Sequence, residues 1–223
     1  MPGRSTHHEA ADRALIAEAY QSLARDGLVR HASGNVSLRQ KNGFLITPSG
    51  MPAHDVTPES IVAMNAKGEP VSAGKPSSEW RFHRDIFAAR KDVNAVVHTH
   101  SPAATALACQ RRSLPPFHYM IALAGGDDVR CSDYALFGTQ ELSDAVLVAL
   151  AGRKACLMAN HGLVACGATL SGAMLVAAEV EGLCDVYLRS LQVGPPILLS
   201  GAEMKAALAA FKTYGPNNAG RRA

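Results

Sequence analysis

The chain has 223 residues, of which 48% are apolar, and this composition predicts one soluble globular domain with a sizeable core. A net charge of +3 with scattered basic residues excludes the concentrated basic surface of a nucleic-acid-binding protein. No apolar run approaches the roughly 18 residues of a membrane helix, and the N-terminus lacks the apolar stretch of a signal peptide. We therefore expect a cytoplasmic protein without nucleic-acid or membrane partners.

The cysteine content agrees with a reducing compartment. The number is odd, the spacing is wide and most neighbours are apolar, which favours buried free thiols over a disulfide framework or a zinc knuckle. The five are Cys109, Cys131, Cys156, Cys166 and Cys184.

The N-terminal third predicts one helix and three strands. Helical periodicity covers about 9–26 and ends at a glycine. Apolar segments at 36–39 and 44–47 flank Lys41-Asn42-Gly43, which is typical of a β-hairpin. A further short strand is expected at 61–64.

The middle of the chain predicts helices that begin at polar caps. Ser77 and Ser78 can cap a helix that reaches about residue 89. The strand that follows ends in two histidines, and Ser101-Pro102 then begins another helix. Thr139 caps a helix that reaches about residue 151.

The C-terminal third predicts one strand and two helices. A strand at 155–159 ends in Asn160-His161-Gly162, and residues 163–167 lead to the next helix. The helix expected at about 170–190 is apolar all round, which predicts that it is buried. Ser200 and Glu203 form a capping box for the last helix.

These elements predict a single α/β domain over residues 1–223. Helices are expected on both faces of a mainly antiparallel central sheet. No repeat, linker or change of composition divides the chain. Residues 1–8 and 216–223 are expected to be flexible tails.

Three histidines and a glutamate suggest a divalent metal site. His98 and His100 are two residues apart at the end of a strand, so both imidazoles lie on one face about 6.6 Å apart. His161 ends another strand, and Glu79 supplies a carboxylate. Three imidazoles with an open position are the ligands of a catalytic zinc site, although a His-x-His pair can also be simply hydrogen-bonded within a core. The remaining histidines are interpreted as surface or packing residues: His7, His8, His31, His54, His83 and His118.

Several motifs together resemble the class II aldolase/adducin family over nearly the whole chain. They are Ser33-Gly34-Asn35-Val36-Ser37, Ile46-Thr47-Pro48-Ser49-Gly50, Pro76-Ser77-Ser78-Glu79-Trp80-Arg81-Phe82-His83, Val96-Val97-His98-Thr99-His100, His118-Tyr119-Met120-Ile121-Ala122 and Tyr134-Ala135-Leu136-Phe137-Gly138-Thr139-Gln140-Glu141-Leu142.

The resemblance implies one zinc ion per subunit, or another divalent metal, held by His98, His100 and His161. It implies that Glu79 lies beside the metal as acid and base, a task that favours a raised carboxylate pKa. It places substrate phosphate at a set of turns and at a helix start, where backbone amides can approach an anion. Those residues are Gly34, Asn35, Ser49, Gly50, Ser77 and Ser78.

Weaker parts of the resemblance concern aromatic residues and assembly. Tyr119 matches a residue that reaches the site from an adjacent subunit, and Tyr214 matches one that closes over substrate. Phe137 matches a residue of the aldehyde pocket. A cyclic homotetramer with active sites at its interfaces is implied. Ala32 and Asn160 depart from the family pattern, where a threonine and a histidine are usual.

The resemblance implies reversible cleavage of a ketose 1-phosphate, through a metal-stabilised enediolate, to dihydroxyacetone phosphate and an aldehyde. The pattern is most similar to the bacterial members that act on L-fuculose 1-phosphate and release L-lactaldehyde. An aldolase for 5-deoxyribulose or 5-(methylthio)ribulose 1-phosphate would share every motif. A pentulose-phosphate 4-epimerase has lysine where Thr47 stands, and a non-catalytic adducin-like module lacks the ligand histidines.

Overall fold

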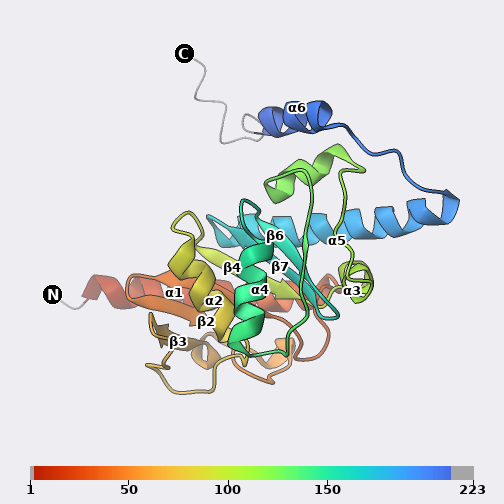
Figure 1. Cartoon of the computed structure of the whole chain (residues 1–223). Coiled ribbons are helices and arrows are strands. Elements are labelled where there is room, and N and C mark those ends of the chain that lie inside the picture. Colours follow the sequence, from red (N-terminus) through yellow and green to blue (C-terminus); the bar gives the residue numbers. More distant parts are fainter. Residues whose placement is uncertain (1–2, 212–223) are drawn as a thin grey trace, which may run out of the picture.

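The centre of the molecule is a seven-stranded sheet (Figure 1). The computed structural model describes the backbone of residues 3–211 and the side chains of residues 8–211. The strands are β1 (Asn35–Gln40), β2 (Gly43–Ile46), β3 (Val62–Asn65), β4 (Ala95–Thr99), β5 (Cys131–Ser132), β6 (Ala155–Met158) and β7 (Gly162–Gly167). Their order is β3-β2-β1-β4-β7-β6-β5, and only the β5–β6 pair is parallel. The expected mainly antiparallel sheet is therefore confirmed.

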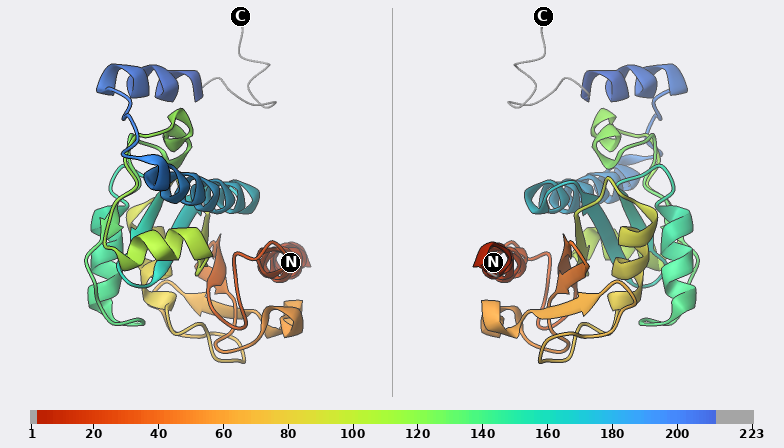
Figure 2. Two further views of the ribbon diagram at one scale, coloured as in Figure 1. Left: turned by 90° about the vertical axis from the view of Figure 1, so that its right-hand side faces the viewer. Right: turned by 90° about the vertical axis from the view of Figure 1, so that its left-hand side faces the viewer.

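Helices cover both faces of this sheet, as expected. They are α1 (Gly3–Arg25), α2 (Trp80–Ala89), α3 (Pro102–Cys109), α4 (Gln140–Ala149), α5 (Leu170–Val193) and α6 (Gly201–Phe211). Figure 2 shows α1 and α4 on opposite sides of the sheet. α2 and α4 pack on one face, whereas α1, α3 and α5 pack on the other. α6 lies beyond the sheet against the 3-10 helix Tyr119–Ala124 (Figure 1).

Strand β4 shows how the sequence separates the two layers of the core. Its residues alternate between the faces, as in any strand. Ala95 and Val97 pack into the cluster beneath α3 and α5, whereas Val96 packs into the cluster beneath α2 and α4. His98 has the same parity as Val96, and its ring contacts Phe82 of α2 at 5.7 Å between centroids. The face covered by α2 is therefore the face that receives the histidine.

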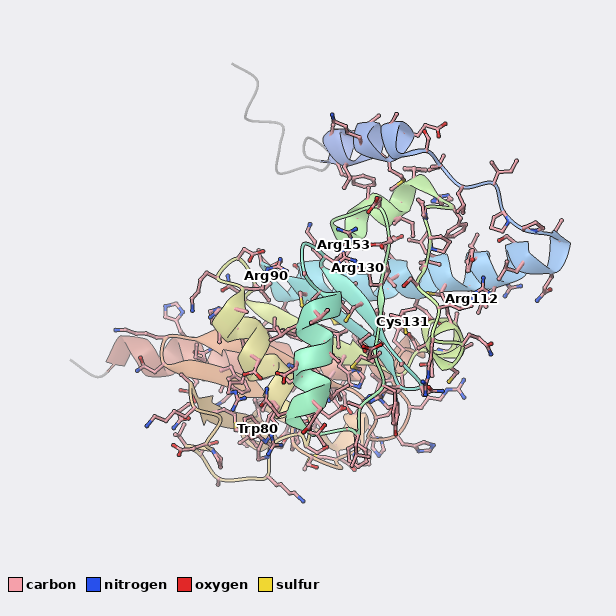
Figure 3. The ribbon with its side chains drawn as sticks, in the orientation of Figure 1. Trp80, Arg90, Arg112, Arg130, Cys131 and Arg153 are labelled. Carbon is pink, nitrogen blue, oxygen red and sulfur yellow. The ribbon has the colours of Figure 1, made fainter. Side chains whose placement is uncertain are left out.

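Helix α2 is held at its C-terminal end by arginines. In Figure 3, Trp80 and Arg90 mark the two ends of this helix. Arg39 of β1 donates to the carbonyl oxygens of Phe87 and Arg90 at 2.8 and 2.7 Å. Arg90 in turn donates to the Arg153 carbonyl at 2.9 Å. Carbonyls at a helix end have no partner within the helix, so these bonds both satisfy them and tie α2 to the sheet.

Most expected elements are present, with shifted ends. The hairpin, the Thr139 cap of α4 and the capping box at Ser200 and Glu203 all form. α1 begins earlier than its periodicity predicts, at Gly3. Ser77 and Ser78 do not cap α2, because Glu79 occupies the N-cap position.

Four further features differ from the sequence prediction. β5 and the helix Tyr119–Ala124 were not expected, since two strand residues and a 3-10 segment carry no periodic pattern. α5 is buried on one side only, and Leu175 and Val186 are exposed in the single chain. All five cysteines are free, but Cys109 is exposed and not buried. Over the described residues, every helix is too short or too polar to cross a membrane.

Candidate metal centre and active site

Glu79 lies at the start of α2 with its carboxylate turned toward the sheet. The residue is only 6% exposed. Its Oε2 accepts a hydrogen bond from Asn35 Nδ2 at 3.0 Å and lies 3.2 Å from His98 Nε2. Its Oε1 lies 3.1 Å from His161 Nε2. Because Glu79 is the N-cap residue of α2 and not part of its helical turns, its side chain can reach Asn35, His98 and His161 on three other segments.

The three histidines come from two neighbouring strands. His98 is in β4, His100 follows its end, and His161 lies in the turn between β6 and β7. Because β4 pairs with β7, the turn comes to the end of β4. The ring centroids are 4.8 to 4.9 Å apart for all three pairs. One ligand atom from each histidine and one from Glu79 lie within 4.8 Å of one another.

Two glycines allow this close approach of backbone and rings. A Cβ on Gly162 would lie 2.3 Å from the Thr99 carbonyl oxygen and 3.2 Å from His100 Cδ2. A Cβ on Gly34 would lie 2.6 Å from the His98 carbonyl oxygen, and the φ of +80° is a left-handed conformation that favours glycine. Glycine is therefore required on both sides of the histidine cluster.

The hydrogen-bond partners of His98 and Glu79 indicate that the cluster suits a cation. His98 Nδ1 lies 2.9 Å from the Leu163 carbonyl oxygen, which can only accept, so Nδ1 carries the proton. In the neutral ring Nε2 then has a lone pair, and this atom faces His100 Nε2 at 3.0 Å as well as Glu79. Glu79 Oε1 is buried and receives no hydrogen bond of good geometry. Converging lone pairs and a buried carboxylate oxygen are the donor set that a divalent metal satisfies.

Electrostatics within the cluster favours the ligand state of Glu79 and His100. Burial raises the pKa of Glu79, but His98 and His161, when protonated, outweigh burial and hold that pKa below its ordinary value. The expected raised pKa is therefore not found while these two imidazoles carry protons. Burial, together with His98 and His161, lowers the pKa of His100 to about 3. His100 is consequently neutral at pH 7, as a metal ligand must be.

A cavity of about 330 Å³ opens beside the cluster and is lined by Glu79, His100 and His161. The whole set of residues expected to hold phosphate also lines it: Gly34, Asn35, Ser49, Gly50, Ser77 and Ser78. Phe137 lines the same cavity, together with its neighbours Tyr134 and Leu136. The described residues that line this cavity include no lysine or arginine.

Tyr119 is not among the described residues that line this cavity. Tyr119 is 55% exposed, and its ring stacks on Phe211 at 6.3 Å between centroids. Tyr214 lies outside the described residues.

His83 was interpreted as a surface or packing residue, but it is fully buried and hydrogen-bonded to Asn35 and Ser37. Its spacing of four residues from Glu79, on one side of a helix, was the available indication.

A buried carboxylate with three imidazoles beside an open cavity places the chain among candidate metalloenzymes. Residues 14–188 match the family model of the class II aldolase and adducin N-terminal domain. The chain belongs to the class II aldolase and adducin family.

Three similar proteins extend over almost all of the chain. A 5-methylthioribulose-1-phosphate/5-deoxyribulose-1-phosphate aldolase of Rhodospirillum rubrum is 51% identical and covers 97% of this chain and 96% of its own. An L-fuculose phosphate aldolase of Escherichia coli K12 is 45% identical, with 90% and 94% covered. A solved L-fuculose 1-phosphate aldolase has a TM-score of 0.88 at 36% identity, with 91% and 96% covered. The chain is accordingly an enzyme of the aldolase class, a carbon–carbon lyase.

Proposed function

We propose that this enzyme cleaves a ketose 1-phosphate reversibly between C3 and C4 to give dihydroxyacetone phosphate and an aldehyde. The observation that carries the proposal is one cavity lined at once by the Glu79 and histidine cluster and by the six amide and hydroxyl residues expected to hold phosphate. A carbonyl activator and an anion site a few ångströms apart are what a short phosphorylated ketone requires.

The proposed cofactor is one Zn²⁺ per subunit, held by His98, His100 and His161 with Glu79 beside it. When bound, the ion supplies Lewis-acid polarisation of the substrate carbonyl and offsets the negative charge that develops after bond cleavage. The nitrogen donors favour zinc over magnesium or calcium, which prefer oxygen ligands.

Glu79 is the proposed acid and base. In cleavage the C4 hydroxyl loses its proton as the C3–C4 bond breaks, and Tyr119 of a neighbouring subunit is the proposed group that takes it up. The Glu79 carboxyl group delivers a proton to C3 of the dihydroxyacetone phosphate fragment, and in condensation both transfers run in reverse. The carboxylate lines the cavity and is nearly excluded from water, so its contacts with His98 and Asn35 determine where the proton is transferred.

Backbone amides and hydroxyls would bind the phosphate without a cationic side chain. Ser77 and Ser78 precede the first turn of α2, where the positive end of the helix dipole attracts an anion. Gly50, with a φ of +70°, turns the chain in another segment of the cavity lining. The Ser77 amide already donates to the Thr47 carbonyl, so the proposed phosphate site is formed by the serine hydroxyls and by the amides of Ser78 and Gly50.

Two substrates are proposed for the aldehyde half. L-Fuculose 1-phosphate would release L-lactaldehyde, which carries a hydroxyl. A 5-deoxyribulose or 5-(methylthio)ribulose 1-phosphate would release a less polar aldehyde, and two observations favour this second candidate. The aldehyde side is lined by Tyr134, Leu136 and Phe137, and the relative at 51% identity is named for these substrates. A methyl group or thioether is worth only about 1 to 3 kcal/mol of discrimination.

A cytoplasmic homotetramer is the proposed form of the enzyme, with Tyr119 reaching the cavity of a neighbouring subunit and Tyr214 closing over substrate. Exposed Tyr119, Leu175 and Val186 support burial of these surfaces between copies, and the free thiols agree with the compartment. Light scattering after size exclusion would measure the assembly, and a monomer that is fully active would contradict it.

A coupled assay for dihydroxyacetone phosphate release tests the function directly. Purified enzyme is loaded with zinc and given a panel of ketose 1-phosphates, with matched ketose 5-phosphates as controls. We expect release from 1-phosphates only, with the highest kcat/KM identifying the aldehyde. Failure to cleave any member of the panel, or undiminished cleavage after removal of metal by a chelator, would overturn the proposal.

A further inference from the structure

A line of four buried polar side chains runs from the sheet to Glu79. Ser37 Oγ lies 2.6 Å from His83 Nδ1, and His83 Nε2 contacts Asn35 Oδ1. Asn35 Nδ2 then donates to Glu79 Oε2 at 3.0 Å. Ser37 and His83 are fully inaccessible, and Asn35 and Glu79 are 2% and 6% exposed. The histidine interpreted as ordinary packing from the sequence is thus linked to the carboxylate of the active site.

Chemistry determines the direction of every bond in this line. An ionised Glu79 can only accept, so the Asn35 amide presents Nδ2 to the carboxylate and Oδ1 to His83. His83 Nε2 must then carry a proton and donate to Oδ1. Nδ1 is left as an acceptor, which receives the Ser37 hydroxyl proton. A single neutral tautomer of His83 is compatible with all three hydrogen bonds of this line.

Backbone geometry makes this line rigid. Asn35 and Ser37 lie two apart in β1 and so share the face covered by α2. His83 lies one helical turn after Glu79 on α2, and its ring stacks on Phe82 at 4.5 Å between centroids. Asn35 pairs directly with His98 in the β1–β4 register. The line therefore connects the helix that carries Glu79 to the strand beside the histidine cluster.

If His83 served only to stabilise the core, any buried hydrogen-bond partner would satisfy its ring. Here the line ends on Oε2, the oxygen that also faces His98 Nε2 at 3.2 Å, and its last member lines the substrate cavity. If the His83 donor is lost, Oδ1 is buried without a partner, and the amide can flip to present oxygen to the carboxylate. A repulsive contact would then move Glu79 out of its orientation.

We propose that His83 is a positioning residue, which donates from Nε2 to Asn35 so that the Asn35 amide holds Glu79 in one orientation toward the histidine cluster and the substrate. This inference rests on the proposed function. Ser37 is not among the residues that line the cavity, and its hydroxyl orients the His83 ring.

Two amide substitutions at His83 distinguish loss of the Nε2 hydrogen-bond donor from loss of the imidazole ring itself. In His83→Gln the amide nitrogen can occupy the place of Nε2 and donate to Asn35. In His83→Asn the shorter side chain reaches Ser37 but not Asn35. Ile86→Ala is the matched control, since it weakens the packing of the same helix at a fully buried residue away from the line.

Each variant is loaded with zinc and measured for metal content, thermal unfolding, kcat and KM. Exchange of deuterium from solvent into the hydroxymethyl carbon of dihydroxyacetone phosphate is followed by NMR without aldehyde, because it reports the proton transfer of Glu79 alone. We expect His83→Asn to lose about 10- to 100-fold in kcat and in exchange rate, with metal content and KM little changed. His83→Gln should recover most of the loss, and Ile86→Ala should lower the unfolding temperature without slowing exchange.

Three outcomes would overturn the positioning role. One is His83→Asn with wild-type exchange, another is His83→Gln as slow as His83→Asn, and the third is Ile86→Ala with an equal loss of exchange. A wild-type enzyme that neither cleaves ketose 1-phosphates nor exchanges this hydrogen would instead refute the proposed function, and the positioning role would fall with it.

Discussion

Zinc should stabilise the wild-type fold, and His100→Ala should abolish most of that effect. The four donors lie within 4.8 Å of one another, in a chain that is already folded around them, so binding needs little reorganisation. At free zinc of about 100 times Kd, the gain is about 2.7 kcal/mol. For a chain of 223 residues each kcal/mol raises Tm by about 2 to 4 °C, which gives a shift of about 5 to 11 °C.

Thermal unfolding followed by circular dichroism during a zinc titration measures this shift. The matched control is His54→Ala, because His54 has a side chain that is 82% exposed and lies outside the cluster. We expect the control to retain the full shift and His100→Ala to lose most of it, with turnover lost in parallel. Equal stabilisation of the two variants by zinc, or none of the wild type, would refute the assignment of the metal site.

Three further predictions concern single residues near this centre. Glu79→Gln should keep zinc stabilisation but slow cleavage by at least about 100-fold, and a variant of normal speed in the coupled assay would contradict its role in proton transfer. Gly162→Ala should lower Tm and zinc content together, since its Cβ would lie 2.3 Å from the Thr99 carbonyl oxygen. Unchanged Tm and metal content would show that the two strands can move apart at little cost in free energy. Burial lowers the pKa of His83 from 6.5 to about 3, so the unfolded chain takes up a proton below pH 6.5 that the folded chain refuses. The free energy of unfolding contributed by neutral His83 is therefore fully present above pH 6.5 and falls by up to about 1.4 kcal/mol per pH unit toward pH 3. Denaturant unfolding at several pH values should show a steeper fall of this free energy for the wild type than for His83→Gln.

Local patterns were sufficient for most of the secondary structure. Asn42-Gly43 favours a hairpin whatever the rest of the fold is. The side chains of Ser200 and Glu203 accept hydrogen bonds from each other's backbone amides and so cap the last helix. Elements without such patterns were missed: Cys131–Ser132 becomes a strand only because β6 is beside it.

The four residues that the structure gathers into one cluster were also predicted together from the sequence. Two histidines spaced two apart at a strand end share a face whatever the rest of the fold does, and a turn after an apolar strand exposes His161. The motifs around them carried the family resemblance, which the match over residues 14–188 confirms.

Only the tertiary structure decided how these groups are held. Asn35 comes opposite His98 because β1 pairs with β4, although the two residues lie far apart in the sequence. His83 looks like any helical histidine until the sheet covers it and leaves Asn35 and Ser37 as its partners. Strand pairing and burial depend on contacts between distant segments, so no local pattern encodes which strand lies beside which or which polar side chain meets the carboxylate of Glu79.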